Sequence, residues 1–535
     1  MKKNILLLVI LFIAFFLRFF QLGAIPASLT WDEVAWGYNA YSLGINGTDE
    51  FGRFLPHDYL ESFGDYKPPM YAYLDVVPIK TFGLNEFATR FPSAFFGLLT
   101  VLVTYFLVKR LFYKSENAKL YGLATSLILA VSPWHIMLSR AAFEANVANF
   151  FVVCGVWLFL AAVQDRPWYL ILSAASFVAS MYTFNSARVV APLLVIILGI
   201  IFLKRLLQHK KSLILAIVVG ILFILPTFKF LLSPQAGLRF QEVNIFSDVS
   251  LVTTSNQEIK NDNNAWWSKI IHNRRLVYTA EYLHHYFDNL NPAFLFIKGD
   301  GNPKFSTQDV GEMYLWDLPF FVIGLVLLFK RKEGKWWVIP IWLLLGIIPA
   351  AFARETPHAL RIENSLPTFQ IVIAYGFVLT ILYFKKYRKL ITVTLLLLLF
   401  LNVLYFLHGY FANYTREYAG EWQYGYKDSL TYLKSVENNY SRIYFTDELG
   451  RPYIYYLFYN KISPSEFRKN SDINRDVFGF VHVNSVGKYY FAKDLPNKEG
   501  KSLYVNIPSM VPSNAHIQKK FYLPNGSEVL IAYTL

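Results

Sequence analysis

Residues 389–411 have the sequence KLITVTLLLLLFLNVLYFLHGYF, a strongly apolar run with no acidic residue. A helix needs about 20 such residues to cross the hydrocarbon core of a bilayer. Similar runs occur at 5–21, 91–112, 119–137, 144–163, 168–184, 187–206, 212–232, 314–330, 335–353 and 365–384. The pattern therefore predicts a polytopic α-helical membrane protein with about eleven transmembrane helices.

The composition agrees with this prediction. The chain has 535 residues, of which 55% are hydrophobic and 16% charged, and its mean hydropathy is +0.33. A soluble globular protein is nearer to about 25% charged. The single cysteine, Cys154, lies inside an apolar run. A disulfide framework and a cysteine-based metal site are therefore excluded.

The distribution of basic residues predicts the orientation of the chain. With the N-terminus in the cytoplasm, the inner segments carry 19 lysines and arginines, whereas the short outer turns hold only Arg140, Arg188, Arg354 and Arg361. This asymmetry is what the positive-inside rule requires. We therefore predict a multi-pass plasma-membrane protein with a retained first span, and we assign the net charge of +14 to topology rather than to nucleic-acid binding.

Two domains follow from this topology. Residues 1–411 form the predicted transmembrane domain, with large outer loops at 22–90 and 233–313, and residues 412–535 form an extracytoplasmic α/β domain. Short runs in that tail predict strands over Arg442–Phe445 and Val529–Tyr533, and helices over Tyr426–Val436 and Pro452–Asn460. The inner loops are too short for a nucleotide-binding fold, so an activated substrate is expected to arrive through the membrane.

The first outer loop contains the most unusual residues. Asp32 and Glu33 directly follow the first span, and acidic groups at a membrane boundary are costly unless they are hydrated or paired. Asp32 is either the cap of a helix over 34–43 or a catalytic residue. Further on, Lys67 lies close to Asp65 in the sequence and is followed by two prolines, which fix the local backbone. Lys67 is therefore either a ligand of a phosphate group or part of an ordinary salt-bridged turn.

Three other groups of residues have two interpretations each. Arg90 lies at the outer mouth of the second span, where it is either an interfacial anchor or a neighbour of Lys67 and Asp32. His358 and Arg361 occupy a short outer turn and are either interfacial or phosphate-binding. His284, His285 and Asp288 have metal-like spacing without an evident third ligand, so a solvated helix is expected there and no metal site is predicted.

An ordered set of motifs carries a resemblance. Asp32-Glu33, then Lys67-Pro68-Pro69, then Asn-Glu-x-x-x-Arg-x-Pro-Ser-Ala over 85–94 is similar to the GT-C glycosyltransferases. Within them the set most resembles the dolichyl-phosphate-mannose protein mannosyltransferases and the aminoarabinose transferase of lipid A. Further matches lie at 132–140 with Glu144, at 294–302 and at 356–361. The resemblance covers roughly residues 1–430 and implies a GT-C fold.

The resemblance also implies a reaction. A sugar passes from a polyprenyl-phosphate donor to a hydroxyl of a protein, lipid or glycan acceptor. Asp32 is the expected base, with Glu33 beside it. Lys67 follows the aminoarabinose pattern, because the mannosyltransferases carry histidine there. The expected substrate contacts are Asp65, Lys67, Arg90, Arg140, Glu144, His358 and Arg361.

Several points stay open at the level of sequence. A single displacement inverts the anomeric carbon, but a two-carboxylate retaining route is an alternative. No cofactor is identified, and a requirement for a divalent cation is left open. A carrier-lipid flippase without covalent chemistry and a polysaccharide polymerase or ligase are the competing functions.

Overall fold

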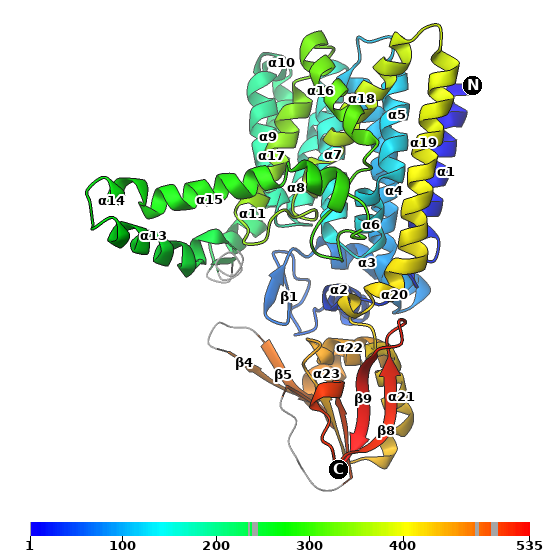
Figure 1. The fold of residues 1–535 in the computed structure, drawn as a ribbon, viewed down its shortest axis with the longest axis vertical. Helices are drawn as coiled ribbons and strands as arrows, with labels where there is room; N and C mark the ends of the chain where they lie inside the picture. The colour runs from blue at the N-terminus through cyan, green and yellow to red at the C-terminus, as the bar shows by residue number, and fades with distance from the viewer. Residues whose placement is uncertain (1, 234–235, 238–243, 477–480, 494–500) are drawn as a thin grey trace. The chain divides into compact units, whose positions relative to one another are not determined.

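The computed structural model describes residues 2–233, 236–237, 244–476, 481–493 and 501–535. The chain forms two compact units, which are described separately (Figure 1). Unit 1 comprises Met1–Leu17, Phe96–Leu138 and Glu144–Phe406, and unit 2 comprises Arg18–Phe95, Ser139–Phe143 and Leu407–Leu535. Helices α1, α4, α6 and α19 begin in one unit and end in the other.

All named secondary-structure elements in the described residues of unit 1 are helices. Its membrane-like helices are α1 (Lys2–Phe19), α4 (Glu86–Leu111), α5 (Ala118–Val131), α6 (Pro133–Arg140), α7 (Glu144–Gln164), α8 (Tyr169–Met181), α9 (Ala187–Ile201), α10 (Leu203–Gln208), α11 (Lys210–Leu231), α16 (Asp317–Arg331), α17 (Val338–Ala351), α18 (Thr368–Tyr383) and α19 (Arg388–His408). Each predicted span coincides with one or two of these helices.

Helix length and hydropathy select fewer spans than the sequence predicts. Among the residues that the structure describes, the candidates are Glu86–Leu111, Glu144–Gln164, Lys210–Leu231 and Arg388–Glu417, and a fifth is the α5–α6 pair, which is bent by 57°. Only 17% of the apolar window of α11 and 11% of that of α19 are buried, so both helices expose apolar side chains. This exposure supports a membrane location, because water does not favour such faces.

A helical hairpin connects the two halves of unit 1. It contains η1 (Ile245–Ser247), α13 (Val249–Asn261), α14 (Ser268–Ile271) and α15 (Arg274–Asp288), and a π-helical turn, η2 (Phe294–Lys298), follows it. Figure 1 shows α13 and α15 side by side, joined through α14. A 3-10 turn, η3 (Glu363–Ser365), precedes α18 and packs against α7 and α17.

Unit 2 combines the segment after the first span with the C-terminal tail. The first part has α2 (Trp31–Asn46), the hairpin β1 (Leu60–Ser62) and β2 (Asp65–Lys67), and α3 (Met70–Phe82). The tail has η4 (Gly409–Tyr414), α20 (Thr415–Glu417), η5 (Gly420–Trp422), α21 (Tyr426–Val436), η6 (Glu437–Asn439), β3 (Arg442–Thr446), α22 (Pro452–Tyr459), α23 (Pro464–Asn470), β4 (Ser471–Arg475), β5 (Val481–Val486), β6 (Tyr489–Ala492), β7 (Ser502–Asn506), η7 (Pro508–Met510), β8 (His516–Tyr522) and β9 (Glu528–Thr534). The predicted tail helices and strands are confirmed.

The tail strands form one mixed sheet of order β4-β5-β6-β3-β7-β9-β8. β3 is parallel to both β6 and β7, and the other pairs are antiparallel. One hydrophobic core contains residues of the sheet, of α21 and α22, and of α2. The two helices α2 and α22 are in close contact, since a Cβ on Gly37 of α2 would lie 2.7 Å from the ring of Phe458 on α22. The tail therefore supports α2 directly.

Candidate active site

The first turn of α2 is fixed by a capping box. The Thr30 hydroxyl accepts a hydrogen bond from Glu33 N at 3.3 Å, and Glu33 Oε2 accepts one from Thr30 N at 2.9 Å. The interpretation of Asp32 as the helix cap is therefore wrong. Asp32 stands two residues after the cap, where an acidic side chain still interacts favourably with the helix dipole. This position leaves its carboxylate available for other contacts.

Asp32 and Lys67 form an ion pair. The Lys67 ammonium donates to Asp32 Oδ1, and it also lies 5.1 Å from the ring of Trp36 and 5.0 Å from that of Phe63. The Lys67 side chain is only 7% exposed, whereas that of Asp32 is 48% exposed. An aromatic cage thus holds the cation and aligns a carboxylate that faces solvent.

The β1–β2 hairpin positions Lys67. Its two-residue turn, Phe63-Gly64, has positive φ at both positions, 47° and 79°, as the turns that best fit a two-residue hairpin require. Lys67 pairs with Leu60 at the end of this hairpin, directly before the two prolines. Asp65 begins β2 two residues earlier, so alternation places it on the same face as Lys67.

Glu33 and Arg90 form a second, fully buried ion pair. Arg90 Nε donates to Glu33 Oε1 at 2.8 Å, and both side chains are 0% exposed. The other two nitrogens of the guanidinium group, Nη1 and Nη2, donate to the carbonyls of Leu22, Pro26 and Ser28. Arg90 therefore ties the chain entering α2 to the start of α4, and its donors are used within the protein.

Arg140 is buried in a similar environment. Its Nη2 donates to the carbonyls of Phe20 at 2.8 Å and Ile25 at 3.1 Å, and its Nε donates to the Tyr410 hydroxyl at 3.3 Å. Two residues later, Ala142 N donates to Glu33 Oε1 at 2.9 Å. The segment 139–143 thus completes the surroundings of Glu33.

The C-terminal tail contributes tyrosines to the same unit. The Tyr455 hydroxyl donates to the carbonyl of Leu29 at 3.0 Å, and that of Tyr453 donates to Glu50 Oε1 at 3.0 Å. Burial raises the pKa of Glu50 to about 8. Sequence reasoning missed these contacts, because no local pattern links residues about 400 positions apart.

A second cluster lies at residues 300–361 of unit 1. His358 Nδ1 is 3.8 Å from Asp300 Oδ2, which accepts a hydrogen bond from Ala359 N at 2.7 Å. Burial raises the pKa of Asp300 to about 6, although its hydrogen bonds and the Arg361 charge oppose that rise. Burial and the Arg361 charge together lower the pKa of His358, so this imidazole is neutral.

Two further buried acids adjoin this cluster. Glu312 Oε1 accepts from Asp300 N at 2.9 Å, and burial raises the pKa of Glu312 well above its usual range. Burial, and less strongly the charge of Glu144, raises the pKa of Glu363 in the same way. Glu312 and Glu363 were not singled out from the sequence, and Asp300 was quoted only within the motif at 294–302.

The predicted site residues thus belong to two groups. Unit 2 contains Asp32, Glu33, Asp65, Lys67, Arg90 and Arg140, whereas unit 1 contains Glu144, His358 and Arg361. Within unit 2 the structure brings together Asp32 with Lys67 and Glu33 with Arg90. Within unit 1 it brings Arg361 near His358, and Glu144 near Glu363.

Comparisons of the sequence found two partial matches. The family model described as dolichyl-phosphate-mannose-protein mannosyltransferase matches residues 66–230. An uncharacterised protein of Aquifex aeolicus is 30% identical over 131 residues, which is 23% of this chain and 26% of that relative. The matched region thus spans about a quarter of the curated relative.

Solved structures extend the likeness to the whole fold. The ArnT protein of Cupriavidus metallidurans in its apo state has a TM-score of 0.56 at 13% identity, over 99% of this chain and 97% of that one. Its complex with undecaprenyl phosphate gives 0.53 at 14% identity over the same shares. The Archaeoglobus fulgidus oligosaccharyltransferase, tethered with an acceptor peptide, gives 0.50 at 13% identity, over 85% of this chain and 63% of that one. The resemblance to GT-C glycosyltransferases is confirmed, and the chain has their helical fold with a C-terminal β-sheet domain.

Proposed function

We propose that this chain transfers a sugar from a polyprenyl-phosphate carrier to an acceptor hydroxyl on the outer side of the membrane. The observation that carries the proposal is the half-exposed Asp32 carboxylate, held by a lysine that is itself caged by two aromatic rings. The comparisons support a lipid-phosphate donor, since ArnT was solved with undecaprenyl phosphate. The cytoplasmic N-terminus and the outer placement of the tail belong to the same proposal.

The reaction is a single displacement at the anomeric carbon. The acceptor oxygen bonds to C1 of the sugar while the bond from C1 to the phosphate oxygen breaks. The phosphate leaves with the electron pair on the carrier lipid, and Asp32 takes the acceptor proton. Such general-base assistance is worth roughly 10²–10⁴-fold. The product then has the opposite anomeric configuration from the donor.

Lys67 is the proposed cation for the leaving phosphate. An ammonium carries three donors, so it can keep Asp32 oriented while it bonds to a phosphate oxygen. Charge that develops on the leaving group is stabilised most where solvent is restricted, and the Lys67 side chain is 7% exposed. Asp65, on the same strand, is proposed to interact with the substrate beside it.

The buried residues receive different proposed roles. Glu33, Arg90 and Arg140 are bonded within the protein, so we propose that they position the first turn of α2 rather than contact the substrate. In unit 1, Arg361 is proposed as a further phosphate ligand. There, Glu144 and the neutral His358 are proposed to form hydrogen bonds with the substrate.

The test is transfer of radiolabel from a polyprenyl-phosphate sugar by the purified full-length protein, with native membranes as the source of acceptor. We expect Asp32→Asn to lower the rate by roughly 10²–10⁴-fold while the protein still folds. Asp58→Asn is the matched control, because Asp58 is a partly exposed, ion-paired aspartate on the same loop. Equal rates for wild-type and Asp32→Asn protein refute the assignment of the base.

A separate experiment identifies the carrier lipid. Mass spectrometry of lipid that co-purifies with the protein is expected to show a polyprenyl phosphate with a sugar headgroup. Transport of that lipid between leaflets without a covalent product would instead show a flippase. Direct use of a nucleotide sugar would overturn the proposal.

A further inference from the structure

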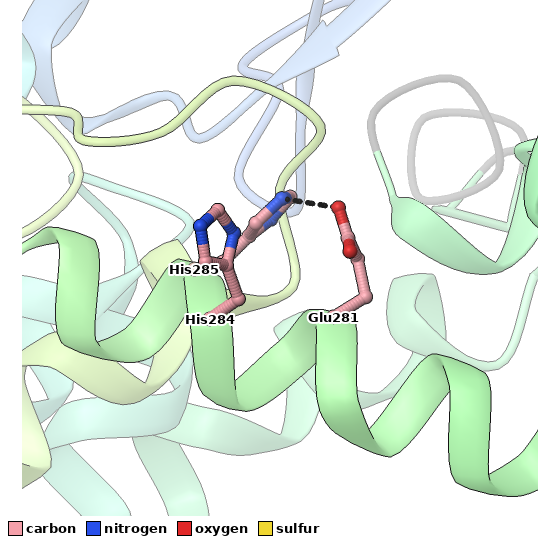
Figure 2. Close-up of side chains that lie close together, drawn as sticks. All are labelled: Glu281, His284 and His285. Carbon is pink, nitrogen blue, oxygen red and sulfur yellow. Dashed lines mark ion pairs between the residues drawn. The ribbon is translucent and has the colours of Figure 1, made fainter.

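Three potential ligands share one face of α15. Glu281, His284 and His285 stand at positions i, i+3 and i+4, which are neighbours on a helix surface. Their ligand atoms all lie within 4.8 Å of one another. Figure 2 shows the three side chains on the same side of the helix, with the His285 ring turned toward the Glu281 carboxylate.

The hydrogen bonds of His285 define its ring. His285 Nδ1 is 2.8 Å from the carbonyl of Ala353, and a carbonyl only accepts, so Nδ1 carries a proton. The other nitrogen, Nε2, is 3.0 Å from Glu281 Oε1. A neutral His285 therefore directs a lone pair at a carboxylate oxygen. Two acceptors at this distance repel unless a proton or a cation lies between them.

We propose that Glu281, His284 and His285 bind a divalent cation of the zinc class. An imidazole that donates its second N–H to a backbone carbonyl is the usual state of a metal-bound histidine. In tetrahedral zinc sites the metal–ligand bonds are about 2.0–2.2 Å, so ligand atoms are separated by roughly 3.3–3.5 Å. The distance between Glu281 Oε1 and His285 Nε2, 3.0 Å, is a few tenths of an ångström shorter than this separation.

The exposure of the three side chains suits ion entry. His285 is 7% exposed and rigidly held, whereas Glu281 is 33% and His284 67% exposed. The exposed ring can therefore turn onto an ion that the other two groups hold. Asp288 Oδ2 lies 3.8 Å from His284 Nδ1, where it can orient that ring from the outer side. Two imidazoles and one carboxylate favour zinc over calcium or magnesium, which prefer oxygen ligands.

The ion would stabilise a neighbouring loop. Besides the bond to Ala353, the Thr356 hydroxyl donates to the carbonyl of His285 at 3.1 Å. One turn later, Asn289 Oδ1 accepts from the backbone N–H of His358 at 3.0 Å. Metal on His285 thus fixes α15 against the segment 353–358.

The experiment is zinc binding by the full-length protein in detergent, after removal of any polyhistidine tag and of resident metal with a chelator. Competition against a chromophoric chelator is expected to show that each protein molecule binds one zinc ion tightly. His284→Ala and Glu281→Gln are each expected to weaken binding by more than about 100-fold, because loss of an outer-shell partner alone costs roughly 10–100-fold. His209→Ala is the control, since His209 is an exposed histidine elsewhere in unit 1.

The outcomes separate the metal site from its alternative. Zinc binding that is lost in both variants and kept in His209→Ala supports the proposal, and cobalt substitution should then give visible bands typical of tetrahedral nitrogen and oxygen ligands. Absence of a tight equivalent, or equal affinity in wild type and both variants, overturns it. A protein that binds no zinc but loses thermal stability on Glu281→Gln contains only an ion pair of protonated His285. Because the readout is metal binding, the result does not depend on the proposed sugar transfer.

Discussion

Replacement of Arg90 tests whether the buried ion pair positions the first turn of α2. The guanidinium donates twice to Glu33 and once each to the carbonyls of Leu22, Pro26 and Ser28. Arg90→Met keeps the apolar stem and removes all five bonds. Glu33, which is 0% exposed, is then an uncompensated buried charge.

The magnitude follows from these contacts. Removing one partner of a buried pair costs roughly 3–5 kcal/mol, and each buried carbonyl that loses its donor adds about 1 kcal/mol or more. The sum is comparable to the entire stability of many domains, which is roughly 5–15 kcal/mol. Arg90→Met is therefore expected to fold poorly. Arg90→Lys retains the charge but has three donors without the planar fork, so we expect a loss of about 2–3 kcal/mol.

The assay is thermal unfolding in detergent, followed by tryptophan fluorescence. One kcal/mol shifts the midpoint by roughly 2–4 °C in domains of 150–250 residues, so Arg90→Lys should lower it by roughly 4–12 °C. The double variant Arg90→Met, Glu33→Met removes both charges but leaves Thr30 N and Ala142 N without their acceptor. It should recover only part of the loss. An Arg90→Met midpoint within about 2 °C of wild type would refute the argument.

Three further changes have separate outcomes. Burial raises the pKa of Glu50 to about 8, above roughly 4.3 in the unfolded chain, so its stabilising effect is complete at low pH and is lost as pH rises through 8. The wild-type midpoint should therefore fall more steeply between pH 5 and 8 than that of Glu50→Gln. In Gly37→Ala the new methyl would lie 2.5 Å from Thr89 Oγ1, and overpacking should cost roughly 1–3 kcal/mol by chemical denaturation. In Gly44→Ala the new methyl would lie 3.1 Å from the flexible Lys80 side chain and at an ordinary 3.6 Å from Val76, so this change should be neutral or slightly stabilising. Lys67→Met should lower the transfer rate by roughly 10²–10³-fold in the radiolabel assay, with Lys67→Arg retaining part of it.

Local sequence patterns predicted the apolar helices and part of the tail (α21, α22, β3 and β9), but not α13 or the strands β4 to β8. The run at 389–411 predicts α19, and the amphipathic stretch at 426–436 predicts α21 with both its ends. Periodicity and hydropathy are properties of residues close together in the sequence, so they can be read without knowledge of the fold. The number of membrane crossings is less determined by these patterns, because the predicted span at 119–137 divides into two helices bent by 57° at Pro133.

Pairings between distant residues could not be predicted in the same way. Arg90 was expected near Lys67 and Asp32, but its carboxylate partner is Glu33. The choice depends on how the backbone of residues 22–28 folds over the guanidinium, which no local pattern encodes. The support of Leu29 by Tyr455 is similar, since the two residues are separated by 426 positions.

Two adjacent acids, Asp32 and Glu33, have opposite environments because of helix geometry. Successive residues on a helix point about 100° apart, and the capping box requires the residue three after Thr30 to turn back toward the cap. Glu33 has that position, and its carboxylate is 0% exposed and paired with Arg90. Asp32 is rotated out of the box and remains 48% exposed. In the proposed mechanism, the position of the cap therefore decides which member of the pair is the base, and the buried member positions the turn that carries the exposed one.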